Sequence, residues 1–499
     1  MSIEEIFLRS LLSRQDSQLT SFCIKDVKYS YSDLFNYVEQ IYEQVKDIQE
    51  EIVYIYSFDD IRTYATILAL WYSGHGYVAL NPIQPLERHN EIIDGVGTHY
   101  IVSCIDGYDA NVEGMQYIHT SQITHDNYSK KYNISVDIYS EEITAYLIFT
   151  SGSTGKPKGV QINRGNLAAF IVSMDQIGLD LTTEDRCLQP FDLSFDFSIS
   201  GYVIPLHKGA SVYTIPQKVS KFIYMAGLLG RHHLTFLQMV PSMARNLLPY
   251  IDEVDRSSIR YNMFGGDALT GNVLKAWPKD CPNMITYNVY GPTENTDICT
   301  SYKIYPDMVD NPLSHNDIIC MGKAFGYTDA IILDDQDQII TSRNIEGELC
   351  LAGKQVTPGY WKNPEENTKK FININRRRFY RTGDMCFYGE DDNLMFTSRK
   401  DFQIKINGFR VETGEIENQY ASISGGRFSV VMPYKDDNGN LSLSIIIEGD
   451  EYDYKQHRTE LSKILPFYEL PSKWLFVDSF PLNNNGKIDR KKLKEIFKL

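Results

Sequence analysis

Short runs of β-branched and aromatic residues alternate with helical patterns along the chain, and this alternation constrains the fold more than any other feature. The runs IVYIYS (52–57), YIVSC (100–104) and AYLIFT (145–150) are typical of buried strands, and an apolar-rich run, TYATILALWYSG, occupies 63–74. Strands that alternate with helices predict α/β units built around buried sheets. We therefore expect a mixed α/β fold.

Composition bounds the class of protein. The 499 residues predict about three compact units at roughly 150 residues each. Hydrophobic residues make up 42% of the chain, enough to form a core, so the chain is not disordered. The net charge of −16 argues against a nucleic-acid partner, which would require a basic face. It leaves room for a small anionic ligand, because such a ligand needs only a local cationic site.

The N-terminus and the cysteines predict a cytoplasmic protein without a membrane segment. Residues 1–15 carry Glu4 and Glu5 where a signal peptide would need positive charge. The longest apolar-rich run, near Tyr64 to Tyr72, is too short to cross a bilayer. The eight cysteines are scattered without a CxxC pair, which indicates reduced, buried thiols.

A domain boundary is predicted near residues 398–402. After Lys400 the sequence DFQIKINGFRVETGEIENQY is typical of two strands followed by a helix that begins near Glu412. We expect an N-terminal region over 1–400 and a smaller α+β unit over 401–499.

The first chemical signal is the segment LIFTSGSTGKPKGV at 147–160. Its glycines let backbone N–H groups approach an anion closely, its hydroxyls add donors and its lysines supply charge. The segment therefore predicts a phosphate-binding loop, with a flexible surface turn as the alternative. It differs from a Walker A loop because Pro157 follows Gly155 and Lys156 directly.

This loop resembles the signature of the adenylate-forming superfamily: acyl-CoA synthetases, luciferases and the adenylation domains of nonribosomal peptide synthetases. Further motifs follow in that family's order: NVYGPTENT (288–296), GELCLAGKQVTPGYW (347–361), YRTGD (380–384), SRKDFQIKINGFRVETGEIE (398–417) and NNNGKIDRKKL (483–493). The N-terminal part matches more weakly through GHGYVALNP (74–82), where Gly76 and Asn81 replace the usual alanine and aspartate. The resemblance implies a large N-terminal domain of several subdomains with β-barrel elements, and a small mobile C-terminal domain.

The family reaction joins a carboxylate to the α-phosphate of ATP, releases pyrophosphate and leaves an acyl-adenylate. One anion attacks another, so catalysis needs cations and donors aimed at the developing charge. By resemblance, Thr293 and Glu294 contact the α-phosphate and magnesium, Asp384 binds both ribose hydroxyls, and Lys487 stabilises the transition state. The residues implied to bind ATP or AMP are Thr150, Ser151, Gly152, Ser153, Thr154, Gly155, Lys156, Lys158, Gly265, Gly266, Asp267, Asn288, Tyr290, Gly291, Asp384 and Arg399.

Two further residues are implied to serve the second half-reaction, in which the acyl group passes to a thiol. Asp401 corresponds to the family's hinge, about which the C-terminal domain turns and carries Lys487 away. Gly408 then lines the tunnel for a pantetheine arm, where a Cβ would not fit. Ser398 stands where the family usually has glycine.

The acyl substrate is indicated by the segment FDLSFDFSISGYVIPLHKGAS at 191–211, which contains FDxS twice. In amino-acid-activating members an aspartate of this motif pairs with the substrate α-ammonium. The family spacing favours Asp196, whereas Asp192 competes if the segment is helical. The implied substrate positions are Asp196, Phe197, Ser200, Gln238, Met263, Gly265, Val289, Asp297 and Ile298. Phe197 and Met263 predict a short pocket. Ser200, Gln238 and Asp297 fit a polar or cationic side chain.

The leading hypothesis is an AMP-forming ligase that activates an amino acid with ATP and magnesium and loads a separate phosphopantetheinylated carrier protein. CoA is the competing acceptor. No carrier domain follows the motif that holds Lys487, which predicts a free-standing ligase similar to D-alanine–carrier-protein ligases. The basic tail at 487–499 either docks an acidic carrier or solvates a helix. The alternatives are an acyl- or aryl-CoA ligase and an inactive homologue that only binds nucleotide or a partner, against which intact Glu294, Asp384 and Lys487 argue.

Overall fold

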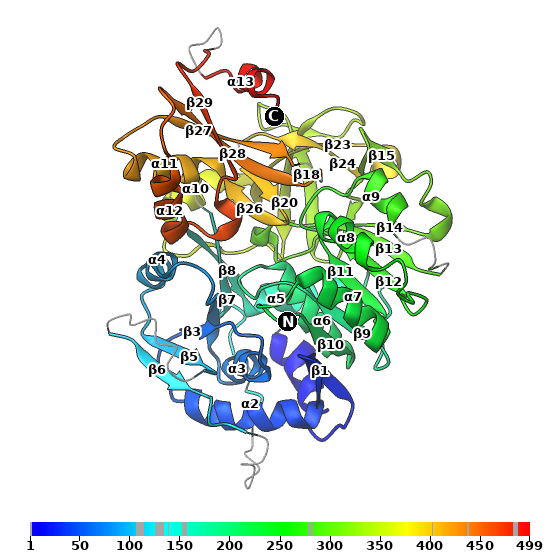
Figure 1. Ribbon diagram of the computed structural model, residues 1–499. Coiled ribbons are helices and arrows are strands. Elements are labelled where there is room, and N and C mark those ends of the chain that lie inside the picture. Colours follow the sequence, from blue (N-terminus) through cyan, green and yellow to red (C-terminus); the bar gives the residue numbers. More distant parts are fainter. Residues whose placement is uncertain are drawn as a thin grey trace. The chain divides into compact units, whose positions relative to one another are not determined.

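The computed structural model describes residues 2–105, 114–124, 134–137, 139–151, 157–277, 281, 283–401, 403–436, 439–482 and 488–499. The chain forms two compact units, drawn in Figure 1. The first comprises Met1–Pro82, Val96–Ile148 and Gly159–Lys400, and the second comprises Ile83–Gly95, Phe149–Lys158 and Asp401–Leu499. The second unit thus includes two short segments from the N-terminal part of the chain. That these units act as a fixed core and a mobile domain stays a prediction.

A nine-stranded sheet supports most of the candidate site. In spatial order its strands are β17 (Lys323–Ala324), β14 (Thr300–Ile304), β13 (Ile285–Tyr290), β12 (Tyr261–Phe264), β11 (Phe236–Met239), β9 (Arg186–Gln189), β10 (Ser211–Thr214), β1 (Thr20–Ile24) and β2 (Val27–Ser30). The strands from β13 to β1 run parallel. Ligands of such sheets bind beyond the carboxyl ends of the strands, which are Met239, Phe264 and Tyr290 for β11, β12 and β13.

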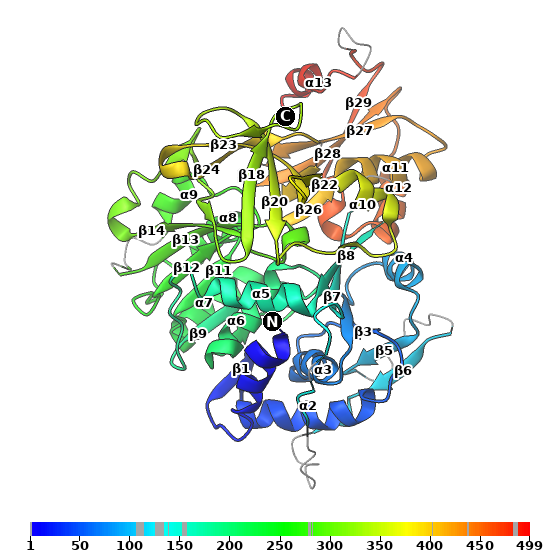
Figure 2. The ribbon, with the colours of Figure 1, turned by 180° about the vertical axis from the view of Figure 1, so that it is seen from behind.

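Helices cover both faces of this sheet (Figures 1 and 2). One face packs on α5 (Arg164–Met174) and α6 (Phe197–Lys208), and the other on α7 (Lys221–His232), α8 (Pro241–Leu247) and α9 (Gly271–Ala276). Successive strand residues point to opposite faces. On β11, Phe236 accordingly packs in the cluster that includes α5 and α6, whereas Leu237 packs in the cluster that includes α7 to α9.

A seven-stranded sheet packs against α3 (Ile61–Tyr72), and α3 in turn packs against α2 (Tyr31–Val45). Its order is β21 (Gly359–Tyr360), β8 (Lys158–Asn163), β7 (Thr144–Thr150), β4 (Gly76–Leu80), β3 (Ile52–Tyr56), β5 (Tyr100–Ser103) and β6 (Gln116–His119). The strands predicted from the sequence are therefore β3, β5 and β7. Close packing explains why glycine occupies position 76, because a Cβ there would lie 2.6 Å from the Thr144 carbonyl oxygen.

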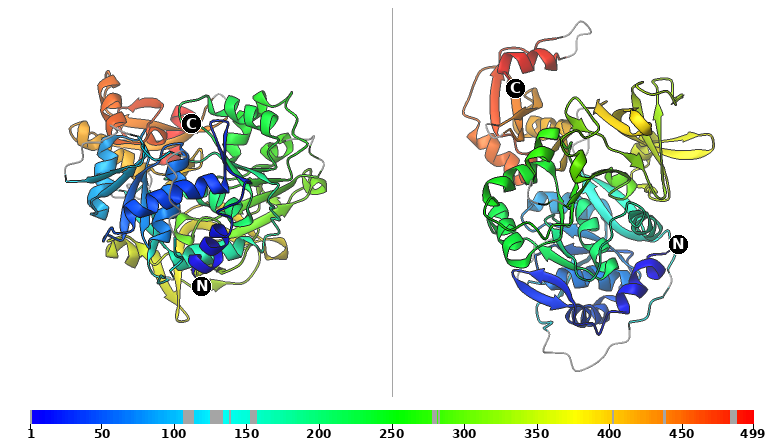
Figure 3. Two further views of the ribbon diagram at one scale, coloured as in Figure 1. Left: turned by 90° about the horizontal axis from the view of Figure 1, so that it is seen from below. Right: turned by 90° about the vertical axis from the view of Figure 1, so that its right-hand side faces the viewer.

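The remaining sheet of the first unit contains β19 (Ile339–Ile340), β18 (Thr328–Leu333), β20 (Gly347–Gly353), β23 (Arg377–Tyr388) and β22 (Phe371–Ile374), with β24 (Leu394–Arg399) paired to β23. In the right-hand view of Figure 3 this yellow-green sheet stands apart from the blue and green layers of the same unit. Smaller elements are η1 (Glu4–Leu8), α1 (Arg9–Leu12), α10 (Pro364–Lys370) and the pair β15 (Ser314–His315) and β16 (Ile318–Ile319).

The second unit is an α+β structure with its own apolar core. Its sheet joins β27 (Ser429–Lys435), β28 (Leu441–Glu448) and β29 (Lys473–Val477), and a separate hairpin joins β25 (Gln403–Ile406) and β26 (Phe409–Glu412). Its helices are α4 (Leu86–Val96), α11 (Thr413–Ile423), α12 (Lys455–Ile464) and α13 (Arg490–Phe497). The hairpin followed by α11 matches the predicted strand pair and helix.

The predicted mixed α/β class is confirmed. All eight cysteines are buried thiols that form no disulfide, as predicted. Within the described ranges, no helix is both long and apolar enough to cross a membrane.

Candidate functional site

Polar and apolar residues gather on one face of the nine-stranded sheet, near the carboxyl ends of its central strands. Gln238 of β11 is in register with Met263 of β12, and Val289 lies near the end of β13. Met263 and Val289 belong to the same buried cluster as Phe197 of α6, and Gln238 hydrogen bonds to that helix. The two-residue period of the strands thus directs these side chains toward α6.

Asp196 connects two motifs that are distant in sequence. It precedes α6, and its Oδ1 accepts a hydrogen bond of 2.8 Å from the Phe197 backbone N–H. Its Oδ2 accepts one of 2.5 Å from the Thr293 hydroxyl. Thr293 begins the 3₁₀ turn η4 (Thr293–Asn295) that follows β13. The structure therefore brings the carboxylate expected for an α-ammonium into contact with the hydroxyl expected for the α-phosphate.

Asp192 has different partners. Residues 192–196 are not helical, because α6 begins at Phe197, so the condition under which Asp192 would share a helical face with Asp196 is not met. Asp192 accepts hydrogen bonds from the Ser194 N–H (2.9 Å) and hydroxyl (2.5 Å). Burial raises its pKa, and hydrogen bonding to Asn81 opposes that shift. The Asn81 that departs from the family pattern thus lies beside Asp192.

Ser200, one turn into α6, links two further substrate positions. Its backbone N–H donates to Asp297 Oδ2 at 3.1 Å, and its hydroxyl accepts from Gln238 Nε2 at 2.7 Å. Gln238 Nε2 also donates to the Phe197 carbonyl at 2.5 Å. Burial and the nearby charge of Asp196 raise the pKa of Asp297 well above its usual range. The four polar positions Asp196, Ser200, Gln238 and Asp297 therefore form one buried group.

Two glycines permit close packing around this group. A Cβ on Gly265 would lie 2.8 Å from the Phe197 ring and 2.9 Å from Val289. A Cβ on Gly291 would lie 1.8 Å from the Asp297 carbonyl oxygen, so only glycine fits in the YGPTE turn. Ile298, the last of the predicted substrate positions, is buried in the same cluster as Phe197 and Met263.

Asp384 lies at the centre of a second polar group in the same unit. It is opposite Arg399 in the register of β23 and β24, and Arg399 Nη1 donates to its Oδ1 at 2.7 Å. The Tyr290 hydroxyl donates to its Oδ2 at 2.5 Å. Burial, and next the charge of Asp384, raise the pKa of Tyr290 well above its usual value, so the phenol stays a donor. A carboxylate offers about four lone pairs, so Asp384 retains capacity for further hydroxyl donors.

Glu294 is completely buried beside a residue that the sequence reasoning did not single out. The Tyr360 hydroxyl donates to Glu294 Oε1 at 2.6 Å, and the Thr357 N–H donates to the Glu294 carbonyl at 2.8 Å. Tyr360 is part of the segment GELCLAGKQVTPGYW, which was recognised as a motif but assigned no role. The place of Tyr360 in that motif is the sequence signal that marks it as a candidate site residue.

Of the residues implied to bind ATP or AMP, Asn288 lies within β13, and Gly266 and Asp267 follow β12. Asn288 Nδ2 donates to the Cys320 carbonyl at 2.8 Å, which leaves its carbonyl oxygen as the group to accept from an exocyclic amine. Gly266, the second residue after β12, has a φ of +74°. Asp267 Oδ1 accepts from the Ala268 N–H at 3.0 Å.

The remaining predicted residues belong to the second unit. Thr150 and Ser151 follow one another at the end of β7, and Lys158 begins β8. The Ser151 hydroxyl donates to the Arg410 carbonyl at 2.9 Å and accepts from the Glu412 N–H at 3.0 Å, so it is held by β26. Asp401 precedes the hairpin, and Gly408 occupies its turn with a φ of +87°. Outside the described residues lie Gly152, Ser153, Thr154, Gly155, Lys156 and Lys487.

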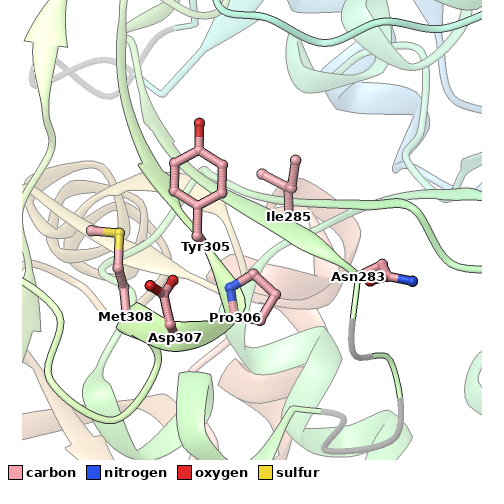
Figure 4. Close-up of a pocket in the computed structure, with 6 residues that line it drawn as sticks. All are labelled: Asn283, Ile285, Tyr305, Pro306, Asp307 and Met308. Carbon is pink, nitrogen blue, oxygen red and sulfur yellow. The ribbon is translucent and has the colours of Figure 1, made fainter.

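A surface pocket of about 540 Å³ lies elsewhere in the first unit (Figure 4). It is lined by Asn283, Ile285, Tyr305, Pro306, Asp307 and Met308. Ile285 begins β13, whereas Tyr290 ends it, so this pocket is at the opposite end of the strand from the predicted ligand residues.

A protein-family model described as AMP-binding enzyme matches residues 13–361. The match covers more than half of the chain, and the protein therefore belongs to the AMP-binding enzyme family. The resemblance read from the motifs is confirmed, and with it the use of ATP that defines these adenylate-forming enzymes.

Among similar proteins, the D-alanine–D-alanyl carrier protein ligase of Lacticaseibacillus paracasei is 28% identical over 461 residues, which cover 89% of each chain. Bacitracin synthase 3 of Bacillus licheniformis is 30% identical over 441 residues, which cover 86% of this chain but only 7% of the synthase. The Vibrio cholerae adenylation domain AlmE, solved with glycyl-adenosine-5'-phosphate, shares the fold with a TM-score of 0.83 at 24% identity, covering 98% of this chain and 97% of AlmE.

Proposed function

We propose that the protein activates an amino acid as an aminoacyl-adenylate, releases pyrophosphate, and transfers the aminoacyl group to the phosphopantetheine thiol of a separate carrier protein. The observation that carries this proposal is the hydrogen bond of 2.5 Å between Thr293 and Asp196. The ammonium and carboxylate of an α-amino acid are separated by one carbon. A group that recognises the ammonium must therefore adjoin a group that contacts the α-phosphate, and Asp196 and Thr293 meet this requirement.

The relatives support the same activity. D-alanine–D-alanyl carrier protein ligases match along nearly their whole length, and the chain matches one segment of bacitracin synthase 3. The first group is named for joining an amino acid to a carrier protein. CoA remains the competing acceptor, to be separated by experiment.

The chemistry follows from where charge develops. The substrate carboxylate attacks the α-phosphate, and the bond from that phosphorus to the bridging oxygen of pyrophosphate breaks. In our proposal Lys487 neutralises the charge shared by carboxylate and α-phosphate. Thr293 donates to the α-phosphate, and Asp384 holds the ribose hydroxyls against Arg399 and Tyr290. The glycine-rich loop with Lys156 and Lys158 binds the β- and γ-phosphates.

Magnesium fits the donor set at Glu294. A hard cation prefers carboxylate oxygens, and magnesium is commonly bound by one or two carboxylates together with substrate phosphates. Glu294 is a fully buried carboxylate with one oxygen oriented by Tyr360. No cluster of three or more His, Cys, Asp or Glu able to hold a metal occurs in the part of the chain that the structure describes. In our proposal the ion enters with the nucleotide, whose charge it offsets.

We also place this activity in the cytoplasm, which supplies ATP and keeps thiols reduced. The eight buried thiols without disulfides support this location.

The test is ATP–pyrophosphate exchange with a panel of amino acids, fatty acids and aryl acids. We expect exchange with an amino acid and its loss in Lys487→Ala, while the matched variant Lys491→Ala, on the exposed side of α13, retains it. Asp196→Asn should abolish amino-acid-dependent exchange. Exchange with fatty or aryl acids but no amino acid would contradict the proposal. A phosphopantetheinylated carrier or CoA, added afterwards, identifies the acceptor by the thioester formed.

A further inference from the structure

A second carboxylate accompanies Asp196 in the buried group at α6. Asp297 is only 4% exposed and has a left-handed backbone with a φ of +69°. Its hydrogen-bond donor is the neutral Ser200 N–H, at 3.1 Å. No cation pairs with Asp297 among the described residues, and the pKa of its carboxyl is raised by burial and by Asp196. A buried carboxylate without a cation is costly, so this position calls for a positive partner.

Two buried polar atoms near Asp297 have no hydrogen-bond partner among the described residues. Gln238 is completely buried, and its Nε2 makes both of its hydrogen bonds while its Oε1 makes none within the described chain. The hydroxyl of Tyr146 on β7 is likewise buried without a partner in that part of the chain. Burial raises the pKa of this phenol well above its usual value, and Tyr77, Asp297 and Asp196 add to that shift. Natural proteins pair nearly all buried polar atoms, so unpaired acceptors grouped together indicate a missing donor.

Ser200 contacts both Asp297 and Gln238. It donates its N–H to Asp297 and accepts at its hydroxyl from Gln238 Nε2, so both side chains lie against one turn of α6. A donor that serves both the Asp297 carboxylate and the Gln238 oxygen needs several hydrogens and a positive charge. An alkylammonium has three donors and one charge.

We propose that the amino acid substrate carries a second ammonium on its side chain, and that Asp297 and the Gln238 carbonyl oxygen bind it while Asp196 binds the α-ammonium. This inference rests on the proposed function, because it names the substrate class of the same site. The methylenes of such a side chain would lie against the apolar residues Phe197, Met263, Val289 and Ile298.

The geometry of α6 sets the expected length of the substrate side chain. The Phe197 N–H donates to Asp196 and the Ser200 N–H donates to Asp297, so these two donors lie three residues apart on α6, a rise of about 4.5 Å along the axis. A substrate whose two ammonium groups are separated by the Cα and roughly two or three methylenes fits this spacing, and its side chain is shorter than that of lysine. A diamino acid of the 2,4-diaminobutyrate or ornithine class is therefore expected.

The experiment compares diamino acids with neutral isosteres in ATP–pyrophosphate exchange. The pairs are 2,4-diaminobutyrate with norvaline, ornithine with norleucine, and lysine with 2-aminoheptanoate. For the wild type we expect kcat/KM to favour the shorter diamino acids over their isosteres by roughly 100-fold or more, as removal of one partner of a buried charge pair implies. Asp297→Asn should lower kcat/KM for the diamino acids far more than for the neutral isosteres, and so remove this preference. The matched control Asp175→Asn changes an exposed carboxylate paired with Lys208 and should leave the preference intact.

The possible results separate failure of this inference from failure of the proposed function. A wild type that activates neutral amino acids in preference to diamino acids overturns this inference and leaves the proposed function standing. Equal loss of all substrates in Asp297→Asn, with the variant folded, also overturns it, since Asp297 would then be structural. Exchange with no amino acid at all, but with other carboxylic acids, overturns both. If Asp297→Asn does not fold, the wild-type panel together with Gln238→Met decides, because that variant removes the unpaired oxygen and should lower the preference for the diamino acid.

Discussion

The buried charge pair between Arg88 and Glu415 should dominate the stability of the second unit. Arg88 of α4 is 3% exposed, and its Nη1 lies 2.7 Å from Oε1 of Glu415 on α11, which is 1% exposed. Glu469 is completely buried nearby, and neither of its carboxylate oxygens has a hydrogen-bond partner in the described structure. Burial, and next the charge of Glu415, raise the pKa of Glu469 well above its usual range, and the charge of Arg88 opposes that shift. One guanidinium therefore stabilises two buried acids.

Replacing Arg88 by methionine keeps much of the length of the side chain but removes this charge. Breaking a buried pair by removing one partner costs about 3–5 kcal/mol, because the other charge stays buried and uncompensated. That loss corresponds to a roughly 100- to 5,000-fold increase in the equilibrium constant for local opening. The double variant Arg88→Met, Glu415→Leu removes both charges and should recover most of the loss.

Hydrogen exchange followed by mass spectrometry on the full chain measures this opening, because protection of α11 amides reports local unfolding. Peptides within Thr413–Ile423 should exchange faster in Arg88→Met by a factor in that range. Arg458→Met, which changes an exposed arginine of α12, serves as the matched control. Equal exchange in Arg88→Met and Arg458→Met, or no recovery in the double variant, would refute the reasoning.

The other predictions concern pH, the site and packing. Because the pKa of Glu469 is raised in the folded chain, the stability that it contributes is present below the ordinary glutamate pKa of about 4.3 and is lost as pH rises through the folded value. Glu469→Gln should flatten this decline of the unfolding free energy in urea titrations over a pH series. The same dependence on pH in the variant and the wild type would contradict the argument. Thr293→Val removes a donor to Asp196 and should lower kcat/KM for the amino acid by roughly 10- to 100-fold in exchange assays, with an unaltered value arguing against the contact. Gly76→Ala places a Cβ 2.6 Å from the Thr144 carbonyl and should reduce the free energy of unfolding by about 1–3 kcal/mol; a more stable variant would exclude the clash.

Much of the fold was predictable from the sequence because burial leaves a periodic signal. The runs that became β3, β5 and β7 are continuous apolar segments, as expected for strands covered on both faces. The strand pair and helix after Lys400 were equally visible, since their pattern changes at Glu412. The inclusion of 83–95 and 149–158 in the second unit was not predictable, because it depends on contacts such as Arg88 with Glu415 that lie far apart in sequence.

The sequence predicted the site residues that lie in family motifs, but it did not decide the contacts between residues of different motifs. Sequence spacing favoured Asp196 over Asp192, but only the structure shows that the segment between them is not helical and that Asp192 lies beside Asn81. The motif at 347–361 marks Tyr360 as a candidate, but its contact with Glu294, 66 residues away, depends on the folded chain. The grouping of Asp297 with Gln238 likewise depends on how β11 and the loop between η4 and β14 meet α6.

Transfer of ¹⁸O from the substrate tests the central claim most directly. An amino acid labelled at both carboxylate oxygens is incubated with the protein, ATP and magnesium, and hydroxylamine serves as an acceptor that does not require the carrier. Attack on the α-phosphate forms a bond between phosphorus and a labelled oxygen, and hydroxylamine then breaks the bond from that oxygen to the acyl carbon. The account predicts one ¹⁸O atom in the AMP and one in the hydroxamate. Label in inorganic phosphate, or AMP without label, would contradict it.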